Sequence, residues 1–559
     1  MIYRVLFFLC LTLQIKAQPN FQWAKAIGGN TADDAYGVTT DFTGNVYTVG
    51  SFNGAVDFDP GPGVFTITGQ KDVFISKLDA SGSFVWAKAF GAQGADHAQA
   101  IYADSLGNTY IIGTFQGTVD FNPGPAVYTL TSVWGNDVFV LKLDSGGNFL
   151  WAKSIEGTSG ETCSSMAVDK NGYIYIVGYF SGTADFDPSG ATYTLSCSGT
   201  SAMFISKMDN SGAFVWAEAI GGGASYTMGH SITLDKFGNI YTTGSFNGTL
   251  DFDPGPAVYN LTTYNNNSDN AFILKLNSSG NFIWAKELWG TNSIGRSVAV
   301  DQLGYVYTTG YFSGTIDFDP NGGIVYLSAV AFAGDAFVSK LDQSGNFIWA
   351  KKIGGKNNEY GTCISVDVSG KVYVAGNFND TVDFNPGPTI NNLISSGASD
   401  AFILLLDSSG QFITAKKVGG VVNDYINSLH VNMNGDIYTT GTFGITANFD
   451  TDGGVFNLVS SGNNDVFIHK MSNGVQAIAE NKKEIELAVF PNPTAAELFI
   501  ICSKPGTLSV KNLLGQNVTD ETVIKEGTTR IDLTGLDKGI YFLQLSGNFF
   551  SQLKKIIKE

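Results

Sequence analysis

The strongest constraint on the fold of this chain is a seven-fold internal repeat. The segment Gly-Thr-Ile-Asp-Phe-Asp-Pro at 314–320 has six counterparts, and its central phenylalanine returns at intervals of about 65 residues. A period this long and this regular is typical of repeat architectures, in which each repeat supplies one supersecondary unit. The seven copies of this phenylalanine are Phe58, Phe121, Phe186, Phe252, Phe318, Phe384 and Phe449.

Each period contains four segments that alternate in hydrophobicity and are rich in Val, Ile, Tyr, Phe and Thr. In one copy they are 297–301, 305–310, 335–341 and 346–351. Alternation with period two predicts β-strands. Four antiparallel strands, repeated seven times, predict an all-β fold, a seven-bladed β-propeller.

The order of the strands predicts how this ring closes. The array begins with a copy of the fourth strand, Phe21 to Ile27, and ends with a copy of the third, 465–471. The N-terminal strand can therefore supply the missing outer strand of the last blade, which leaves no open hydrogen-bonding edge.

Turn and packing positions repeat with the strands. Asp-x-x-Gly separates the first and second strands, as at 301–304, and a similar turn separates the third and fourth, as at 342–345. Both are predicted to be short hairpins with glycine at positive φ. Of the 41 phenylalanines, 28 fill four repeat positions, and a tryptophan position becomes Thr414 in its last copy. Such regular aromatic residues are predicted to pack between sheets.

The Asp-Phe-Asp motif places two acidic or amide side chains on the same side of a strand. They are predicted to cap the Pro-Gly-Pro turn that follows, with calcium binding and direct ligand contact as alternatives. Any calcium would be held weakly, as in many extracellular modules. The residues assigned to this calcium hypothesis are Asp57, Asp59, Asp185, Asp187, Asp251, Asp253, Asp317 and Asp319.

Charge and the N-terminus indicate the setting. The net charge of −18 disfavours nucleic acid as a partner. Residues 1–17 combine Arg4, a short apolar run and Ala17 before a cleavage point, which predicts a signal peptide and no transmembrane segment in the mature chain. The remaining cysteines lack metal-binding spacing and are expected to be buried, with at most one disulfide. They are Cys163, Cys197, Cys363 and Cys502.

The repeat resembles a known bacterial family. The pattern Gly-Asn-x-Tyr-x-x-Gly-x-Phe, then Thr-Val-Asp-Phe-Asp-Pro-Gly-Pro, then Asp-x-Phe-x-x-Lys-Leu-Asp-x-x-Gly-x-Phe-x-Trp-Ala-Lys is similar to the SBBP β-propeller repeats and covers about 21–471. The resemblance implies a propeller in an exported protein and no particular activity.

The tail resembles a second family. Residues 476–487 are predicted to be a linker, and 488–559 carry short alternating strands that suggest a small β-sandwich. The Pro-Asn-Pro start, the Leu-x-Gly-x-x-Val motif and the final Lys-Lys-Ile-Ile-Lys are similar to the type A sorting domain of the type IX secretion system. The resemblance implies the type IX secretion machinery as a partner, and a secreted or outer-surface location in a Gram-negative bacterium.

For function, the sequence favours a monomeric binding or adhesion propeller at 18–475, with a glycan or protein ligand. The long loops that follow the second and fourth strands share one face, where binding is expected. One alternative is an extracellular polysaccharide hydrolase or lyase that uses carboxylates on this face, and another is a structural surface component. No catalytic or cofactor residue is assigned. The residues that break the repeat, and that an enzyme would direct into the central channel, are Asp33, Asp34, Asp96, His97, Glu359 and Tyr360.

Overall fold

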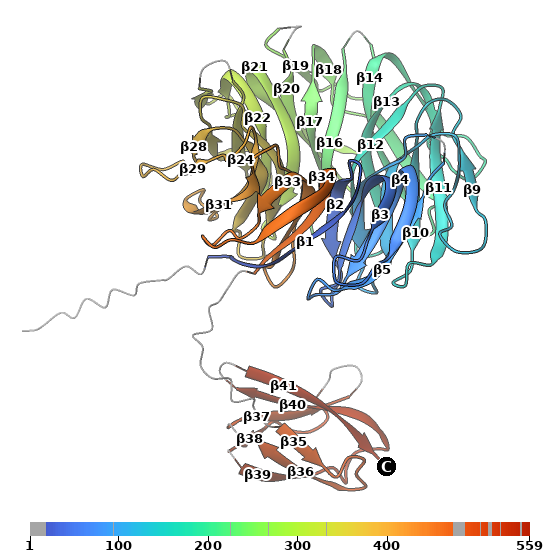
Figure 1. Ribbon diagram of the computed structural model, residues 1–559, viewed down its shortest axis with the longest axis vertical. Helices are drawn as coiled ribbons and strands as arrows, with labels where there is room; N and C mark the ends of the chain where they lie inside the picture. The colour runs from blue at the N-terminus through green and yellow to red at the C-terminus, as the bar shows by residue number, and fades with distance from the viewer. Residues whose placement is uncertain are drawn as a thin grey trace, which may run out of the picture. The chain divides into compact units, whose positions relative to one another are not determined.

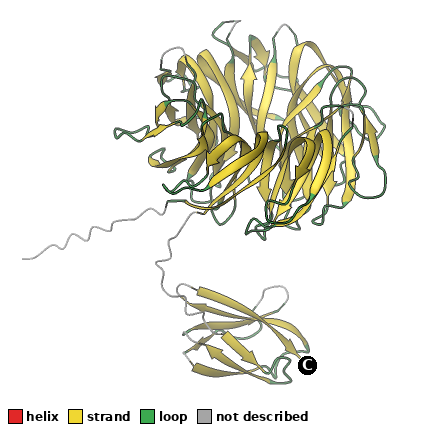
Figure 2. Cartoon of the chain, viewed as in Figure 1, coloured by secondary structure: helices red, strands yellow, loops and turns green. Residues whose placement is uncertain are grey.

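The computed structural model describes residues 18–92, 94–223, 225–265, 268–330, 333–472, 487–502, 505–512, 517–525, 527–547 and 550–559. The predicted signal peptide, 1–17, and all but the last residue of the predicted linker lie outside these ranges. The described residues form strands and loops with no helix (Figures 1 and 2). The chain divides into two compact units, Met1–Gly474 and Val475–Glu559.

In the first unit, each repeat forms antiparallel strands in the order first, second, third, fourth. The first strands are β2 (Asp34–Thr40), β6 (His97–Ala103), β12 (Glu161–Val168), β16 (Thr227–Leu234), the second half of β21 (Phe282–Val300), β26 (Tyr360–Val366) and β32 (Tyr425–Val431). The second strands are β3 (Val46–Asp57), β7 (Thr109–Phe115), β13 (Ile174–Asp185), β17 (Ile240–Phe246), β22 (Val306–Asp317), β27 (Val372–Phe378) and β33 (Ile437–Asn448).

The third strands are β4 (Thr66–Leu78), β10 (Asp137–Leu143), β14 (Thr194–Met208), β20 (Asn270–Leu276), β24 (Asp335–Leu341), β30 (Asp400–Leu406) and β34 (Asn457–Ser472). The fourth strands are β5 (Phe84–Phe90), β11 (Phe149–Gly157), β15 (Phe214–Gly221), the first half of β21, β25 (Phe347–Ile353), β31 (Phe412–Gly420) and β1 (Asn20–Gly29). Short strands extend the second-to-third connections: β8 (Thr118–Asp120), β9 (Thr129–Thr131), β18 (Thr249–Asp251), β19 (Asn260–Thr262), β23 (Tyr326–Ser328), β28 (Thr381–Asp383) and β29 (Asn392–Ile394).

The two ends of the repeat array meet. As the sequence predicts, β1 pairs antiparallel with β34, so the N-terminal strand completes the last repeat. The end of β1 also pairs with β3 in the first repeat. Consecutive first strands contact one another around the array, and β32 contacts β2. A hydrogen bond from the Asn427 amide to the Ala35 carbonyl oxygen joins these two strands at 2.9 Å. The repeats therefore form a propeller-like arrangement (Figure 1).

The repeated phenylalanines pack as predicted at three of their four positions. Phe58, Phe52 and Phe74 of the first repeat are at most 1% exposed. Their rings meet edge-on or tilted at 5.3–6.4 Å, and the equivalent residues of the other six repeats are also buried. The fourth position is half-buried, and Phe84 there packs on Phe65 of the long connection at 5.0 Å. The Asp-Phe-Asp motif thus anchors the connection in the core.

Most junctions between repeats also bury two carboxyl groups. One carboxyl group comes from a third strand. The other comes from the first strand of the next repeat, or from the loop just before that strand. Asp137 and Glu161 are one such pair, and both are fully buried. Burial raises the pKa of Asp137 to about 6, and burial next to Asp137 raises the pKa of Glu161 to about 9. The other such pairs are Asp465 with Asp33, Asp335 with Glu359, and Asp400 with Asp424. At one further junction the buried Asp96 lies near Asp72, which is half-buried.

The second unit contains two small sheets around one hydrophobic core. One sheet has the order β35 (Leu487–Phe490), β36 (Glu497–Cys502), β39 (Gly527–Asp532). The other has the order β38 (Thr522–Ile524), β37 (Gly506–Lys511), β40 (Gly539–Gly547), β41 (Phe550–Lys558). The core includes Leu498, Val510 and Leu543, which are at most 1% exposed.

Candidate functional site: the central cavity

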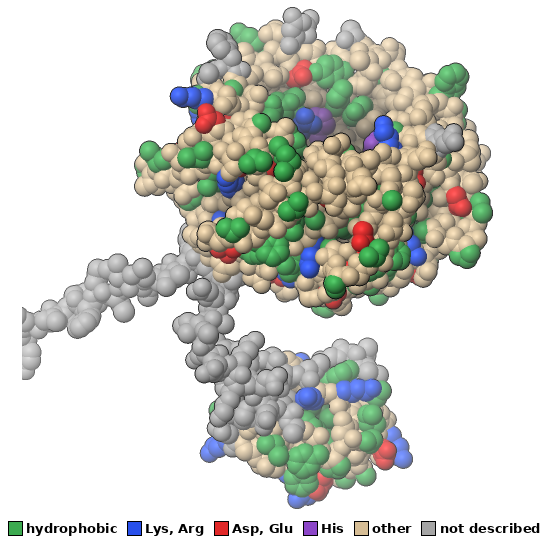
Figure 3. All heavy atoms as spheres, in the orientation of Figure 1, with side chains coloured by type: hydrophobic (Ala, Val, Ile, Leu, Met, Phe, Trp, Pro, Cys, Tyr) green, Lys and Arg blue, Asp and Glu red, His purple; other side chains and the backbone are tan. Residues whose placement is uncertain are grey.

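A cavity of about 850 Å³ lies among the first strands of the propeller unit. This volume lies within the range of roughly 300–1,000 Å³ that is usual for ligand pockets. All seven first strands contribute to its wall, mainly through their N-terminal halves. Figure 3 shows a hollow on this unit in which basic and histidine side chains are visible. The cavity lies at the end of the strands where the long connections are, as the sequence predicts for a binding face.

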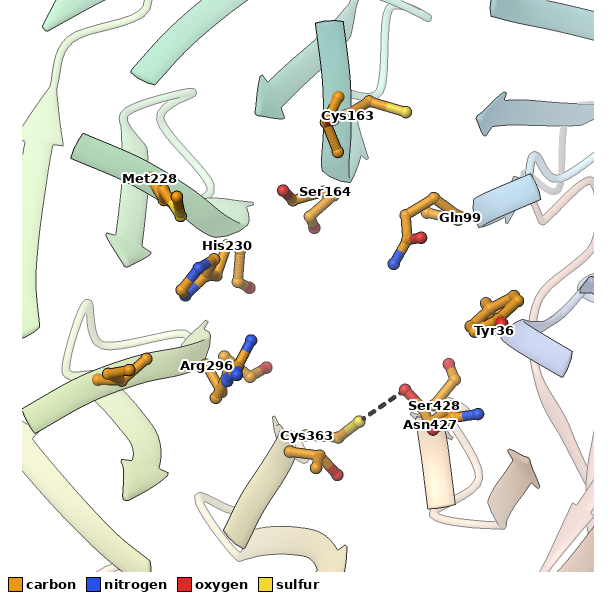
Figure 4. Close-up of a pocket in the computed structure, with 18 of the residues that line it drawn as sticks. Tyr36, Gln99, Cys163, Ser164, Met228, His230, Arg296, Cys363, Asn427 and Ser428 are labelled. Carbon is orange, nitrogen blue, oxygen red and sulfur yellow. Dashed lines mark hydrogen bonds between the residues drawn. The ribbon is translucent and has the colours of Figure 1, made fainter. Parts of the chain in front are cut away.

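Every first strand has a β-bulge at the same place. In β6 the register shifts between Ala98 and Ala100, which leaves Gln99 without a backbone partner. A bulge re-aims the side chain of its extra residue, and each bulged residue lines the cavity (Figure 4). The seven bulged residues, which we call the bulge ring, are Tyr36, Gln99, Ser164, His230, Arg296, Thr362 and Asn427.

A glycine in the second strand accommodates each bulge. Gly113 lies opposite Ala98, and a Cβ atom on Gly113 would stand 2.0 Å from the carbonyl oxygen of His97 and 2.6 Å from the Phe139 ring. Only glycine fits between these groups. The same glycine recurs opposite the other bulges, as Gly50, Gly178, Gly244, Gly310, Gly376 and Gly441.

The bulge ring is the place where the repeats differ most in chemistry. Its members are a phenol, two amides, two hydroxyls, an imidazole and a guanidinium, whereas the buried residue before each bulge is small in six of seven copies. Positions that pack in the core keep the same residue in every repeat, because their surroundings are the same. Positions that contact a ligand without seven-fold symmetry are expected to differ from repeat to repeat. Sequence reasoning missed this ring. Its signal was the glycine of Tyr-x-x-Gly-x-Phe, because a glycine inside a strand often marks a bulge.

Neighbouring first strands hold part of the ring in place. His230 contacts the Gly295 carbonyl oxygen through Nδ1 at 2.9 Å, and the Thr362 hydroxyl donates to the Ile426 carbonyl oxygen at 3.0 Å. In contrast, Gln99, Ser164 and Arg296 donate no side-chain hydrogen bond to any residue in the described ranges. These three side chains are therefore available to a ligand.

The electrostatics of the wall are nearly neutral although the protein is acidic. Burial, and then the nearby Arg296, lower the pKa of His230 to about 4, so this imidazole is uncharged at neutral pH. Arg296 is then the one cation among the lining residues that the structure describes, and Asp269 is the one carboxylate. The Tyr226 hydroxyl donates a hydrogen bond to Asp269, while Arg296 lies 5.6 Å from the centre of the Tyr311 ring.

The residues that the sequence singled out as asymmetric have separate positions. Tyr360 lines the cavity, and its ring meets Tyr311 edge-on at 4.8 Å. Asp33, Asp96 and Glu359 are at most 1% exposed and belong to the carboxyl groups at the junctions between repeats, so they do not face the channel. His97 contacts the Ser51 hydroxyl at 3.3 Å. All four cysteines outside residues 1–17 are free, and Cys163, Cys197 and Cys502 are buried.

The aspartates of the calcium hypothesis make the hydrogen bonds that turn capping predicts. Asp57 Oδ1 accepts the backbone N–H groups of Asp59 and Phe65 at 3.1 and 2.8 Å. Asn448, an amide at the same position, accepts the equivalent bonds at 3.0 and 2.9 Å. Among the described residues, no three or more His, Cys, Asp or Glu side chains form a group suited to a metal ion. Calcium binding at these pairs stays a prediction.

The opposite face carries a feature that the sequence analysis did not anticipate. The seven turns between first and second strands are Asp-x-x-Gly in six copies and Asn-x-x-Gly at 432–435. Six of the seven turns expose one large apolar side chain, between 74% and 78% accessible. The seventh turn carries Lys170 and Asn171. The exposed side chains are Phe42, Leu106, Phe237, Leu303, Val368 and Met433.

Two family models match the chain. Residues 488–559 match the secretion system C-terminal sorting domain. Residues 22–56, 150–183 and 216–250 match the SBBP beta-propeller repeat. The sorting domain marks a secreted or cell-surface protein of the type IX system, in Bacteroidetes-type bacteria. No helix of the described residues has the length and apolarity needed to cross a membrane.

Two curated proteins are similar to parts of the chain. A WD repeat-containing protein of Acanthamoeba polyphaga mimivirus is 23% identical over 500 residues, which cover 75% of this chain and 36% of that protein. The regulatory protein FlaEY of Caulobacter vibrioides is 28% identical over 164 residues, 29% of this chain and 17% of that protein. The chain thus spans well under half the length of either relative.

Solved structures show weaker likeness. A protein of unknown function from Bacteroides caccae is 12% identical and covers 54% of this chain and 78% of its own, with a TM-score of 0.30. YCF48 from Cyanidioschyzon merolae is 10% identical and covers 80% and 98%, with a TM-score of 0.30.

Proposed function

Because the chain carries beta-propeller repeats and a secretion system C-terminal sorting domain, we propose that it is a secreted or surface-attached propeller that binds a glycan in its central cavity. In this proposal the propeller has seven blades and is closed by β1. The second unit is a β-sandwich that the type IX machinery uses for export. The protein acts as a monomer at the outer surface of a Gram-negative bacterium.

The bulge ring is the observation that supports binding. A scaffold whose packing residues repeat seven times directs seven mostly different polar side chains into one cavity. Uncharged donors and acceptors next to tyrosine rings suit a polyhydroxylated ligand, because hydroxyls pair with amides while the C–H faces of a sugar pack on aromatic rings. A protein ligand would need apolar pockets for its side chains, and the described wall offers few.

The residues that line this cavity support a hydrolase of the two-carboxylate type less well than they support a binding protein. Such an enzyme needs a pair of carboxyl groups that flank the scissile bond. Among the described lining residues Asp269 is the single carboxylate, and its partner is the Tyr226 hydroxyl. Binding is therefore the function that the geometry supports best.

A glycan-array screen with the full secreted protein tests this proposal. We expect binding to at least one glycan class, and the double variant Gln99→Ala, Ser164→Ala should weaken it about thirtyfold, since two hydrogen bonds of roughly 1 kcal/mol each are lost. Gln302→Ala, in an exposed turn at the other end of the first strands, is the matched control and should bind like the wild type. Absence of glycan binding, or binding that the double variant leaves unchanged, would refute the proposal.

A further inference from the structure

We propose that the central cavity selects a glycan with a single carboxylate, a uronic acid residue, and that Arg296 recognises the carboxylate. This inference rests on the proposed function and adds the chemical class of the ligand.

Arg296 lies in the cavity without an anionic partner among the described residues. It is the bulged residue of the first strand within β21, and its exposed side chain points into the open centre of the ring (Figure 4). No carboxylate of the described residues forms an ion pair with Arg296. A guanidinium group that lacks a partner matches a carboxylate through two parallel hydrogen bonds.

The surroundings of Arg296 position a planar cation beside aromatic surface. Arg296 lies over the Tyr311 ring at 5.6 Å, and Tyr360 meets Tyr311 edge-on. Stacking on an aromatic ring holds the guanidinium plane in a fixed orientation. Because Tyr311 and Tyr360 both line the cavity, they can contact a sugar ring whose carboxylate is bound by Arg296. Gln99 and Ser164 are free to pair with hydroxyl groups of the same ligand.

The charges of the protein limit the ligand to one anionic group. The neighbouring His230 is neutral at pH 7, so Arg296 alone supplies positive charge in the described wall. The net charge of the chain is −18, and a polyanion would be repelled by the field of the whole protein. A short oligosaccharide with one terminal uronic acid meets both conditions, whereas a polyuronate does not.

The test compares one trisaccharide in two forms, with a terminal glucuronic acid as the free acid and as its methyl ester. Calorimetric titration of the full secreted protein should show at least tenfold tighter binding of the free acid. Arg296→Gln should lower the affinity for the acid at least tenfold and should abolish the preference for the acid over the ester. Melting temperatures of both proteins establish that the variant is folded.

The outcomes separate this inference from the function on which it rests. Equal binding of acid and ester by the wild type, or an acid preference that survives Arg296→Gln, overturns the carboxylate inference while glycan binding stands. If no glycan of the array binds, or the Gln99→Ala, Ser164→Ala variant binds as the wild type does, the proposed function fails as well. A polyuronate that binds more tightly than the trisaccharide at low salt overturns the restriction to one carboxylate.

Discussion

The indole N–H of Trp349 donates a hydrogen bond to the backbone carbonyl oxygen of Ser408 in the next repeat, at 3.3 Å. Lys340, from the third strand, reaches the same oxygen at 2.8 Å. The same contact joins Trp23 to Ala80 and Trp284 to Gln343. Trp86 and Trp151 make the same bond, whereas the buried indole nitrogen of Trp216 has no hydrogen-bond partner among the described residues. Five of the six tryptophans at this position therefore attach one repeat to the third-to-fourth hairpin of the next.

This relationship explains why the seventh tryptophan position holds Thr414. The repeat that contains Thr414 is followed by the last one, whose third strand, β34, pairs with the N-terminal strand β1 and not with a strand that follows it in sequence. That repeat has no third-to-fourth hairpin to accept the bond. Leu405 stands where the other repeats carry the lysine. The tryptophan and lysine donors are therefore both absent at the one junction that lacks the acceptor turn.

Trp349→Phe should destabilise the propeller by about 1 kcal/mol, because the hydrogen bond is lost while most of the packing stays. Trp349→Ala should cost more, roughly 2–4 kcal/mol, which is below the cost for a fully internal residue because the ring lies at the edge of the core. Urea unfolding measures both values. Thr414→Ser is the control at the position without a hairpin contact; it removes one buried methyl group and should cost no more than about 0.8 kcal/mol. A Trp349→Phe variant as stable as the wild type would contradict the hairpin contact.

Deletion of residues 18–30 should lower the melting temperature strongly, because β34 then loses its partner and exposes an unpaired edge. A synthetic peptide of residues 18–30, added in excess, should restore part of the loss by pairing with β34. A peptide with the same composition in scrambled order provides the control. A melting temperature that the deletion leaves unchanged would refute closure of the ring by β1.

Stability should fall as the pH rises from about 5 to about 9. The folded protein holds Asp137 and Glu161 with pKa values of about 6 and about 9, above their ordinary values. A carboxyl group whose pKa is raised by folding stabilises the fold at low pH and loses this contribution as the pH passes through the folded pKa. The expected loss from this pair is on the order of 1–3 kcal/mol.

Glu161→Gln tests the source of this pH dependence, because glutamine keeps the shape and cannot ionise. We expect the variant to match the wild type near pH 5 and to be more stable at pH 9, in chemical denaturation at both pH values. Thr227, which occupies the Glu161 position at the next junction, gives the control. Thr227→Ser should shift stability equally at both pH values, and a pH profile that Glu161→Gln leaves unaltered would contradict the assignment.

Asp57→Asn should change stability by less than about 0.5 kcal/mol, whereas Asp57→Ala should cost about 1–2 kcal/mol through the loss of two accepted hydrogen bonds. The natural Asn448 already shows that an amide oxygen fills this role. Thermal melting in millimolar calcium and in chelator completes the test. Calcium binding at these pairs predicts a higher melting temperature with calcium and a smaller effect in Asp57→Asn, and equal melting in both buffers leaves turn capping as their whole role.

The sequence by itself determined the strands, the repeat and the pairing of the two ends. Alternation placed the strands, the Asp-x-x-Gly spacing placed the hairpins, and the offset between Phe21 and the last third strand predicted that β1 pairs with β34. These features depend on local backbone preference and on periodic burial, which residue order records directly. Phe58 and its equivalents are buried for the same reason.

Only the tertiary structure decided where the repeat becomes specific. Gln99, His230 and Arg296 lie in different repeats and share no motif. In a strand of regular register, each of these side chains would lie on a different side of its strand. The bulge opposite Gly113 and its counterparts shifts that register by one residue. The packing of seven first strands around one centre then brings the bulged side chains to a common cavity. Register and convergence depend on contacts between distant segments, so no single stretch of the sequence encodes them.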